Sequence, residues 1–248
     1  MGTCKLNTEN AETLPPASTS WNLRTTPILL HGHAGGPNPW KVVLLLKELN
    51  IPYEHKLWDF PDLKKPEYEK LCPNGRTPTI EDPNTGITLW ESGAILEYLI
   101  EEYDKENKFT YTSSPEKYQL KQWLHFQVSG QGPYFGQRVW FNIYHADKIP
   151  SAIDRYSKEI KRVLTVLDKH LKDQGTDYLV GDKYTYADLA FIPWNLLLPF
   201  IFGEESEAFH AEVKKELPTY HAWFERIMAR PASQEMKKER EKNFEKKE

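Results

Sequence analysis

A short apolar run, a glycine-rich turn and a leucine-rich run follow one another near the start of the chain. Residues 27–30 are Pro-Ile-Leu-Leu, residues 31–40 hold the turn, and residues 41–49 are Lys-Val-Val-Leu-Leu-Leu-Lys-Glu-Leu. The runs predict a strand and a buried helix, with Asn38 as N-cap and Pro39 as the first helical residue. Such a turn directs backbone N–H groups and the positive end of a helix dipole at one point, which favours an anion. The turn matches no dinucleotide or phosphate motif, so an ordinary capped helix start is the alternative.

The pattern downstream predicts a second strand and a β-hairpin. Residues 53–60 alternate apolar and polar positions, which indicates a strand parallel to the first. Residues 77–82 and 87–90 flank Pro-Asn-Thr-Gly and predict a hairpin. A helix with Ser92 as its cap follows, so the order βαβαββα is complete by residue 104. This order is typical of a small α/β domain over residues 27–104.

The remainder of the chain predicts helices. Residues 105–115 are charged, then rich in Ser and Thr, and end in proline, which indicates a linker. Residues 116–235 carry apolar positions three and four apart, so an all-helical domain is expected. Residues 1–26 are polar and predict a flexible arm. Residues 236–248 form a tail of mixed charge, which indicates either a solvated helix or disorder. The fold class is therefore α/β plus all-α.

Charge, hydropathy and cysteine content limit the kinds of binding partner and the cellular compartment that are expected. The net charge of −4 gives no reason to expect nucleic acid or an anionic membrane as a partner. No apolar run approaches the ~20 residues of a membrane span. The two cysteines, Cys4 and Cys72, cannot build a disulfide framework, which suits a reducing cytosol. A cytoplasmic protein is expected.

Four motifs carry a resemblance to a known family. They are Asn-Gly-Arg-Thr-Pro-Thr-Ile (74–80), Leu-Trp-Glu-Ser-Gly-Ala-Ile-Leu-Glu-Tyr-Leu (89–99), Val-Gly-Asp-Lys-Tyr-Thr-Tyr-Ala-Asp-Leu-Ala (180–190) and Arg-Pro (230–231). Together with the architecture they resemble the glutathione transferases. Residues 37–42, 126–137 and 152–156 further resemble the fungal class related to the yeast nitrogen-catabolite prion regulator, and the bacterial disulfide-reducing nu-class enzymes. The resemblance implies a thioredoxin-like first domain and assigns Thr185 and Asp188 to a structural capping box.

The resemblance also implies residues that bind glutathione. Thr77 and Pro78 match the cis-proline loop, where the backbone of Thr77 would hold the cysteinyl part. Ser92 and the N–H groups of its helix suit the γ-glutamyl carboxylate, and Glu91 suits the ammonium. Lys64, or the lysine after it, would meet the glycine carboxylate. Each residue also has a purely structural interpretation. Pro78 would be an ordinary proline at a sheet edge, Ser92 a helix cap, and Lys64 a solvated surface lysine.

The same resemblance gives Asn38 a catalytic role. A free thiol with a pKa of ~8.5 is mostly protonated at neutral pH, and hydrogen-bond donors with a helix N-terminus lower that value. Many family members use a Tyr or Ser hydroxyl at this turn, but here Asn38 is the expected donor to sulfur. An amide cannot act as a base, so the site would stabilise a thiolate. Gly36, where relatives often carry Thr or Ala, removes a second donor and leaves room for a bulkier electrophile.

A second-substrate pocket against the helical domain is expected to suit an apolar electrophile. Its candidate residues are Gly36, Trp40, His125, Tyr134 and Arg155, with Phe135, Trp140, Phe141 and Tyr144 nearby. Core or dimer contacts are the alternative for the aromatic residues, and a solvated side chain for Arg155. Cys72 is expected to be structural and distant from the sulfur. No metal site is expected, and the family implies a homodimer.

The leading functional hypothesis is a glutathione transferase that acts on an apolar or conjugated electrophile. One alternative is glutathione-dependent cis–trans isomerisation by addition and elimination in fungal secondary metabolism. A second is disulfide or peroxide reduction through the sulfur of glutathione itself. The third is a non-catalytic glutathione-binding regulator. The sequence does not identify the electrophile or the fate of glutathione.

Overall fold

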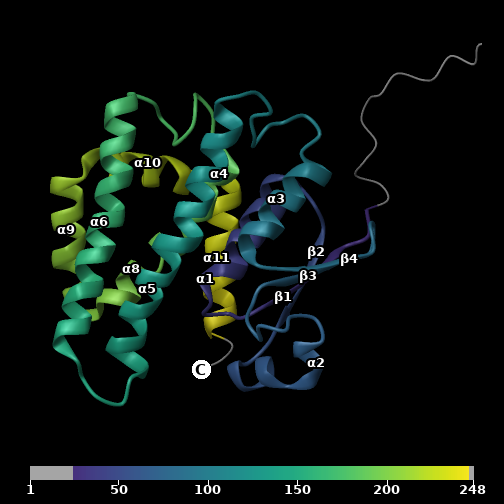
Figure 1. The fold of residues 1–248 in the computed structure, drawn as a ribbon, viewed down its shortest axis with the longest axis horizontal. Coiled ribbons are helices and arrows are strands. Elements are labelled where there is room, and N and C mark those ends of the chain that lie inside the picture. Colours follow the sequence, from purple (N-terminus) through teal and green to yellow (C-terminus); the bar gives the residue numbers. More distant parts are fainter. Residues whose placement is uncertain (1–24, 246–248) are drawn as a thin grey trace, which may run out of the picture.

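A four-stranded sheet domain stands beside a helical domain in the computed structural model, which describes residues 25–245 (Figure 1). The strands are β1 (Ile28–Gly32), β2 (Tyr53–Leu57), β3 (Thr79–Asp82) and β4 (Ile87–Trp90), in the order β2-β1-β3-β4. β1 pairs in parallel with β2, whereas the β1–β3 and β3–β4 pairs are antiparallel. The thioredoxin-like prediction is confirmed. The predicted arm over residues 1–26 lies outside the described residues except for its last two.

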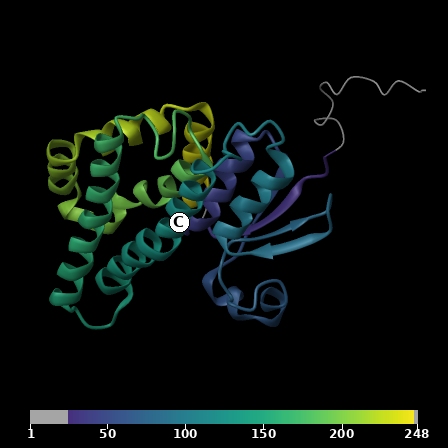
Figure 2. The ribbon, with the colours of Figure 1, turned by 45° about the horizontal axis from the view of Figure 1, so that its top comes forward.

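Helices cover both faces of the sheet. Figure 2 shows α1 (Pro37–Glu48) and α3 (Ser92–Tyr103) above it, and α2 (Pro66–Glu69) with the 3₁₀ turn η2 (Phe60–Lys64) below. α1 is buried nearly all round, because it packs against the sheet domain on one side and against helices of the second domain on the other. This burial brings the start of α1 to the boundary between the two domains.

Three predicted element ends are wrong by one or two residues. β1 continues to Gly32, because His31 and Gly32 still pair with β2. α1 begins at Pro37 with Gly36 in the N-cap position, so Asn38 is not the cap. Proline fits the first helical position because the N–H that it lacks would have no partner in the helix. α3 likewise begins at Ser92 itself, and its N-cap residue Glu91 has a positive φ of 74°.

The second domain is helical, as predicted. α4 (Glu116–Phe126) continues through the π-helical turn η3 (Gln127–Gln131) into α5 (Gly132–Val139) and a second such turn, η4 (Trp140–Tyr144). The following elements are α6 (Pro150–Gln174), α7 (Tyr186–Asn195), α8 (Leu198–Phe202), η5 (Gly203–Glu205), α9 (Ser206–Glu216), α10 (Pro218–Met228) and α11 (Pro231–Glu245). One stretch, 186–216, is apolar and long enough to cross a membrane, but 72% of its apolar window is buried inside the protein. Such burial is typical of a core helix.

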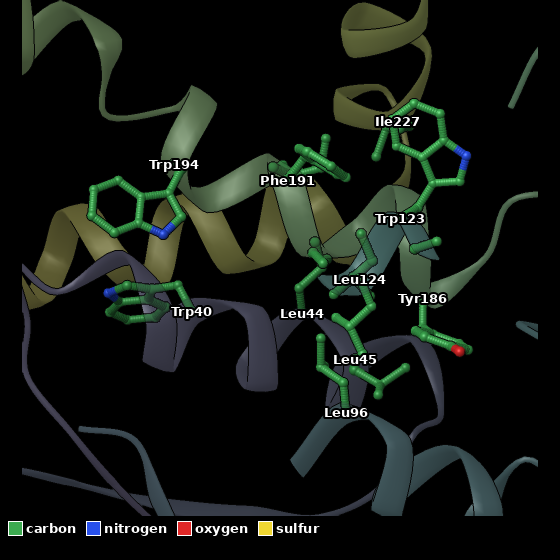
Figure 3. Close-up of a cluster of buried hydrophobic side chains, with 14 of the residues drawn as sticks. Trp40, Leu44, Leu45, Leu96, Trp123, Leu124, Tyr186, Phe191, Trp194 and Ile227 are labelled. Carbon is green, nitrogen blue, oxygen red and sulfur yellow. The ribbon is translucent and has the colours of Figure 1, made fainter. Parts of the chain in front are cut away.

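One hydrophobic core joins the two domains. Figure 3 shows Leu44 and Leu45 of α1 facing Leu124 of α4 and Phe191 of α7. All four side chains have an exposed fraction of 2% or less. These side chains belong to the cores of both domains at once. Because cores are closely packed, the two domains are held in a fixed relative position.

The last helix, α11, returns to the sheet domain. Met236 is fully buried, and Glu239 accepts a hydrogen bond from the Tyr53 hydroxyl at 2.6 Å. Just before α11, Arg230 forms two hydrogen bonds to the Glu48 carboxylate at 2.6 and 2.8 Å. Of the two alternatives for the charged tail, residues 236–245 adopt the helix, and Met236 and Glu239 attach it to partners distant in the sequence.

The capping box at the start of α7 is confirmed. The buried Asp188 carboxylate accepts hydrogen bonds from the backbone N–H of Leu179 at 2.8 Å, from that of Thr185 at 3.0 Å and from Trp223 Nε1 at 2.9 Å. One carboxylate thus ties the preceding loop, the helix start and α10 together.

Replacing this carboxylate should destabilise the fold strongly. In Asp188→Ala the buried N–H donors lose their acceptor, so we expect the free energy of unfolding to fall by about 3–5 kcal/mol. Asp188→Asn should cost less because its amide oxygen still accepts. Urea unfolding measures the change, with the exposed Asp173→Ala as the matched control. Equal losses in Asp188→Ala and Asp173→Ala would contradict this role.

Candidate functional site

Two adjoining cavities lie where the sheet domain meets the helical domain. The smaller, about 90 Å³, is lined by Asn38, Cys72, Asn74, Arg76, Thr77, Pro78, Trp90, Glu91 and Ser92. The larger, about 580 Å³, shares Asn38, Arg76, Glu91 and Ser92 with it. Its further lining residues are Lys41, Val128, Gly132, Pro133, Gly136, Gln137, Trp140 and Trp194.

Three segments of the sheet domain converge on the smaller cavity. The first turn of α1 supplies Asn38, the segment before β3 supplies Thr77 and Pro78, and the β4–α3 junction supplies Glu91 and Ser92. The Thr77–Pro78 peptide bond is cis, as the resemblance implied. Two helix N-termini therefore face one small space, and their free N–H groups make it suitable for anions.

The Asn38 side chain bonds to the helical domain rather than to its own helix. α1 has no side-chain cap, and the Asn38 Oδ1 atom accepts a hydrogen bond from Trp194 Nε1 at 2.9 Å. An N-cap asparagine accepts with its Oδ1 atom, and here Trp194 holds that oxygen instead. The Nδ2 group is the end of the amide that can donate to a ligand.

The structure adds Lys41, which the sequence analysis did not select. Its Nζ atom donates to Ser92 Oγ at 3.2 Å and to Gln127 Oε1 at 2.5 Å, and the side chain is 1% exposed. Burial lowers the pKa of Lys41 to about 7, against the opposing attraction of Glu91. The sequence signal was a single lysine at the head of an apolar helical run.

The loop before β3 departs from the predictions at three residues. The Lys64 ammonium donates to the backbone oxygen of Asn74 at 3.1 Å, and Lys64 lines neither cavity. Arg76 lines both, although sequence reasoning did not select it. Cys72 was expected away from the sulfur position, but it is buried and lines the smaller cavity with Asn38. Loop conformation, which sequence spacing does not define, accounts for these differences.

The predicted second-substrate residues are not brought together. Trp40 is fully buried and its Nε1 atom donates to the backbone oxygen of Ala34 at 2.9 Å, so its placement in a pocket is wrong. Tyr134 packs beside Tyr156, and His125 and Arg155 are exposed. Neither these residues nor Gly36 lines the two cavities.

Of the neighbouring aromatic residues, Phe135 lies in the core and Trp140 in the cavity wall, whereas Phe141 and Tyr144 line neither cavity. Phe135 is fully buried and packs edge-on against Trp194, with ring centroids 6.2 Å apart. Trp140, about half exposed, lines the larger cavity. The aromatic wall of that cavity is therefore Trp140 and Trp194.

Comparison with known proteins establishes the family. Residues 35–102 match the family described as "Glutathione S-transferase, N-terminal domain" and residues 134–231 match "Glutathione S-transferase, C-terminal domain". This chain belongs to the glutathione S-transferase family. Glutathione S-transferase 2 of Schizosaccharomyces pombe is 52% identical over 212 residues, which cover 82% of this chain and 91% of that protein.

Solved structures of Ure2-like transferases share the whole fold. URE2P6 from Phanerochaete chrysosporium, in complex with oxidized glutathione, aligns with a TM-score of 0.80 at 43% identity, covering 87% of this chain and 97% of that one. Ure2p5 from the same organism, cocrystallized with 1-(S-glutathionyl)-2,4-dinitrobenzene, aligns with a TM-score of 0.80 at 36% identity. That alignment covers 89% of this chain and 97% of the Ure2p5 chain.

The buried Lys41 should give stability a distinctive pH dependence. Its pKa is about 7 in the folded protein, against an ordinary lysine value of 10.5. Between these two pH values the unfolded chain holds a proton that the folded one does not. The stability of the native protein relative to Lys41→Met should therefore rise with pH across this window, by about 1 kcal/mol per pH unit.

Urea unfolding of the native protein and of Lys41→Met at several pH values measures the difference between their free energies of unfolding. The titration of all other groups is common to both proteins and cancels in this difference. Lys158→Met removes a lysine that is 76% exposed and serves as the matched control. A stability difference for Lys41→Met that does not change with pH would contradict the prediction.

Proposed function

We propose that this protein is a glutathione transferase that stabilises the thiolate of glutathione for attack on an apolar or conjugated electrophile. The observation that carries the proposal is the meeting of two helix N-termini with the Thr77–Pro78 segment around one cavity. This arrangement offers backbone donors to two anionic groups of one peptide-like ligand. The complexes of URE2P6 and Ure2p5 with glutathione derivatives support the choice of ligand.

Glutathione would lie along the wall formed by the sheet domain. Thr77 precedes β3 and stands outside its ladder, so its backbone groups are free to pair with the cysteinyl part as an additional strand would. Ser92, with the Lys41 ammonium behind it, suits the γ-glutamyl carboxylate, and Glu91 suits the ammonium. Arg76, which lines both cavities, replaces Lys64 as the proposed cationic partner of the glycine carboxylate.

The sulfur would lie beside the first turn of α1. The Asn38 Nδ2 group would donate to it, and the helix dipole would add a favourable field. Neither group removes a proton, so the thiol would ionise to water or buffer and the site would hold the anion. The thiolate sulfur then forms a bond to carbon. A halogenated electrophile releases halide, whereas a conjugated enone takes the electron pair into its carbonyl system and is protonated by water at the α-carbon.

The electrophile would occupy the larger cavity. Its volume of about 580 Å³ is within the range of small-molecule sites. Val128, Pro133, Trp140 and Trp194 supply apolar and aromatic surface, and Gly132 and Gly136 add no side chain to the wall. This lining favours a planar or apolar electrophile. A homodimer in the cytoplasm is proposed as its working form, on the family resemblance and the cysteine usage.

The reaction type is tested by the mass of the product. Conjugate addition to an enone increases the mass of the electrophile by that of glutathione, and substitution on a chloronitrobenzene increases it by that of glutathione less the HCl released. Isomerisation leaves the mass unchanged, and disulfide exchange gives a mixed disulfide. We expect the adduct when a chloronitrobenzene or a conjugated enone is supplied with glutathione. An unchanged mass with altered absorbance would favour the isomerase, and glutathione binding with no product would favour the regulator.

Asn38→Ala should weaken thiolate stabilisation. A hydrogen bond to a charged group contributes about 1.5–3 kcal/mol, so we expect kcat/KM to fall about 10- to 100-fold and the thiol pKa of bound glutathione to rise. Thiolate absorbance against pH measures that pKa. S-methylglutathione, which has no thiol, is the control ligand and should bind with unchanged affinity. A thiol pKa that stays at its native value would refute the assignment of Asn38.

A further inference from the structure

We infer that Trp194 is a positioning residue for this reaction, which holds the Asn38 amide with its nitrogen toward the sulfur of glutathione. The inference rests on the proposed function and adds a residue of the helical domain to it. Trp194 Nε1 donates to Asn38 Oδ1 at 2.9 Å, across 156 positions of the chain. Both residues line the larger cavity.

The two ends of an asparagine amide have nearly the same shape and opposite chemistry. The NH₂ end donates hydrogen bonds and would stabilise a thiolate, whereas the oxygen accepts them and would repel one. Nothing in the side chain itself selects between the two orientations. An indole N–H is only a donor, so it can hold only the oxygen. The bond from Trp194 therefore leaves Nδ2 as the end of the Asn38 amide that remains available.

The position of the indole is itself well defined. Trp194 is 7% exposed and packs edge-on against the buried Phe135. A Cβ atom at Gly132 or Gly136 would lie 3.5 or 3.4 Å from the ring, in ordinary van der Waals contact, so α5 lies directly beside the indole. In Figure 3 the ring projects from α7 with its nitrogen on the side of α1 and Trp40. The donor is thus fixed before any ligand arrives.

The inference predicts an effect on sulfur chemistry rather than on affinity. Trp194→Phe removes the N–H and keeps an aromatic ring. We expect the thiol pKa of bound glutathione to rise and kcat/KM to fall about 10-fold at neutral pH, with little loss well above the free thiol pKa of ~8.5. The affinity for S-methylglutathione should stay within about twofold, because that ligand has no thiol to ionise.

Two controls separate the N–H from packing. Phe135→Leu disturbs the same packing while retaining the N–H, so it should raise the thiol pKa much less than Trp194→Phe does. Benzothienylalanine at position 194 replaces the N–H with sulfur in a ring of nearly the same shape, and it should reproduce the effect of Trp194→Phe. This second variant also serves if Trp194→Phe does not fold.

A double-mutant cycle tests whether Trp194 acts through Asn38. The pair Asn38→Ala with Trp194→Phe should be no slower than Asn38→Ala alone, because the amide to be oriented is already absent. Independent, multiplicative losses would overturn the inference, as would a native thiol pKa in both position-194 variants. If Asn38→Ala itself leaves the thiol pKa unchanged, the proposed thiolate role of Asn38 fails and this inference fails with it.

Discussion

The burial of α1 on all sides is the constraint on which the remaining structure depends. Its apolar residues need partners in two directions, and each fully buried aliphatic side chain contributes about 1.5–3 kcal/mol. The sheet satisfies one side and α7 the other, so neither domain could bury this helix alone. The same packing carries Asn38 and Lys41 to the domain boundary and removes the Lys41 ammonium from water. The polar chemistry of the site is thus a consequence of where the leucines pack.

The site divides its tasks between the two domains. The sheet domain supplies groups that suit the peptide backbone and charges of glutathione, at Thr77, Glu91 and Ser92. The helical domain supplies the wall of the larger cavity and the indole that bonds to Asn38. In the proposed function, variation in the second domain would change both the electrophile and the reactivity of the sulfur, while the proposed glutathione-binding wall stays the same.

Sequence reasoning was strongest where a local pattern determines the structure. The strand and helix periods gave the domain folds, and a compact motif gave the cis Thr77–Pro78 bond. It failed where the partners are distant in the chain. The sequence around Lys41 does not predict its hydrogen bond to Gln127, and the sequence of α7 does not predict the bond from Trp194 to Asn38. Trp40 shows the converse limit, because an aromatic residue beside a predicted site has the same letter whether it faces a ligand or the core.

The return of α11 to the sheet domain has a consequence for how the protein is made. During synthesis β1, α1 and β2 leave the ribosome well before the helix that carries Met236 and Glu239. Until that helix emerges, Glu48 lacks Arg230, Tyr53 lacks Glu239, and the sheet domain has an incomplete surface. The sheet domain therefore precedes the helical domain in synthesis but is completed after it. Its final stability must await the synthesis of α11.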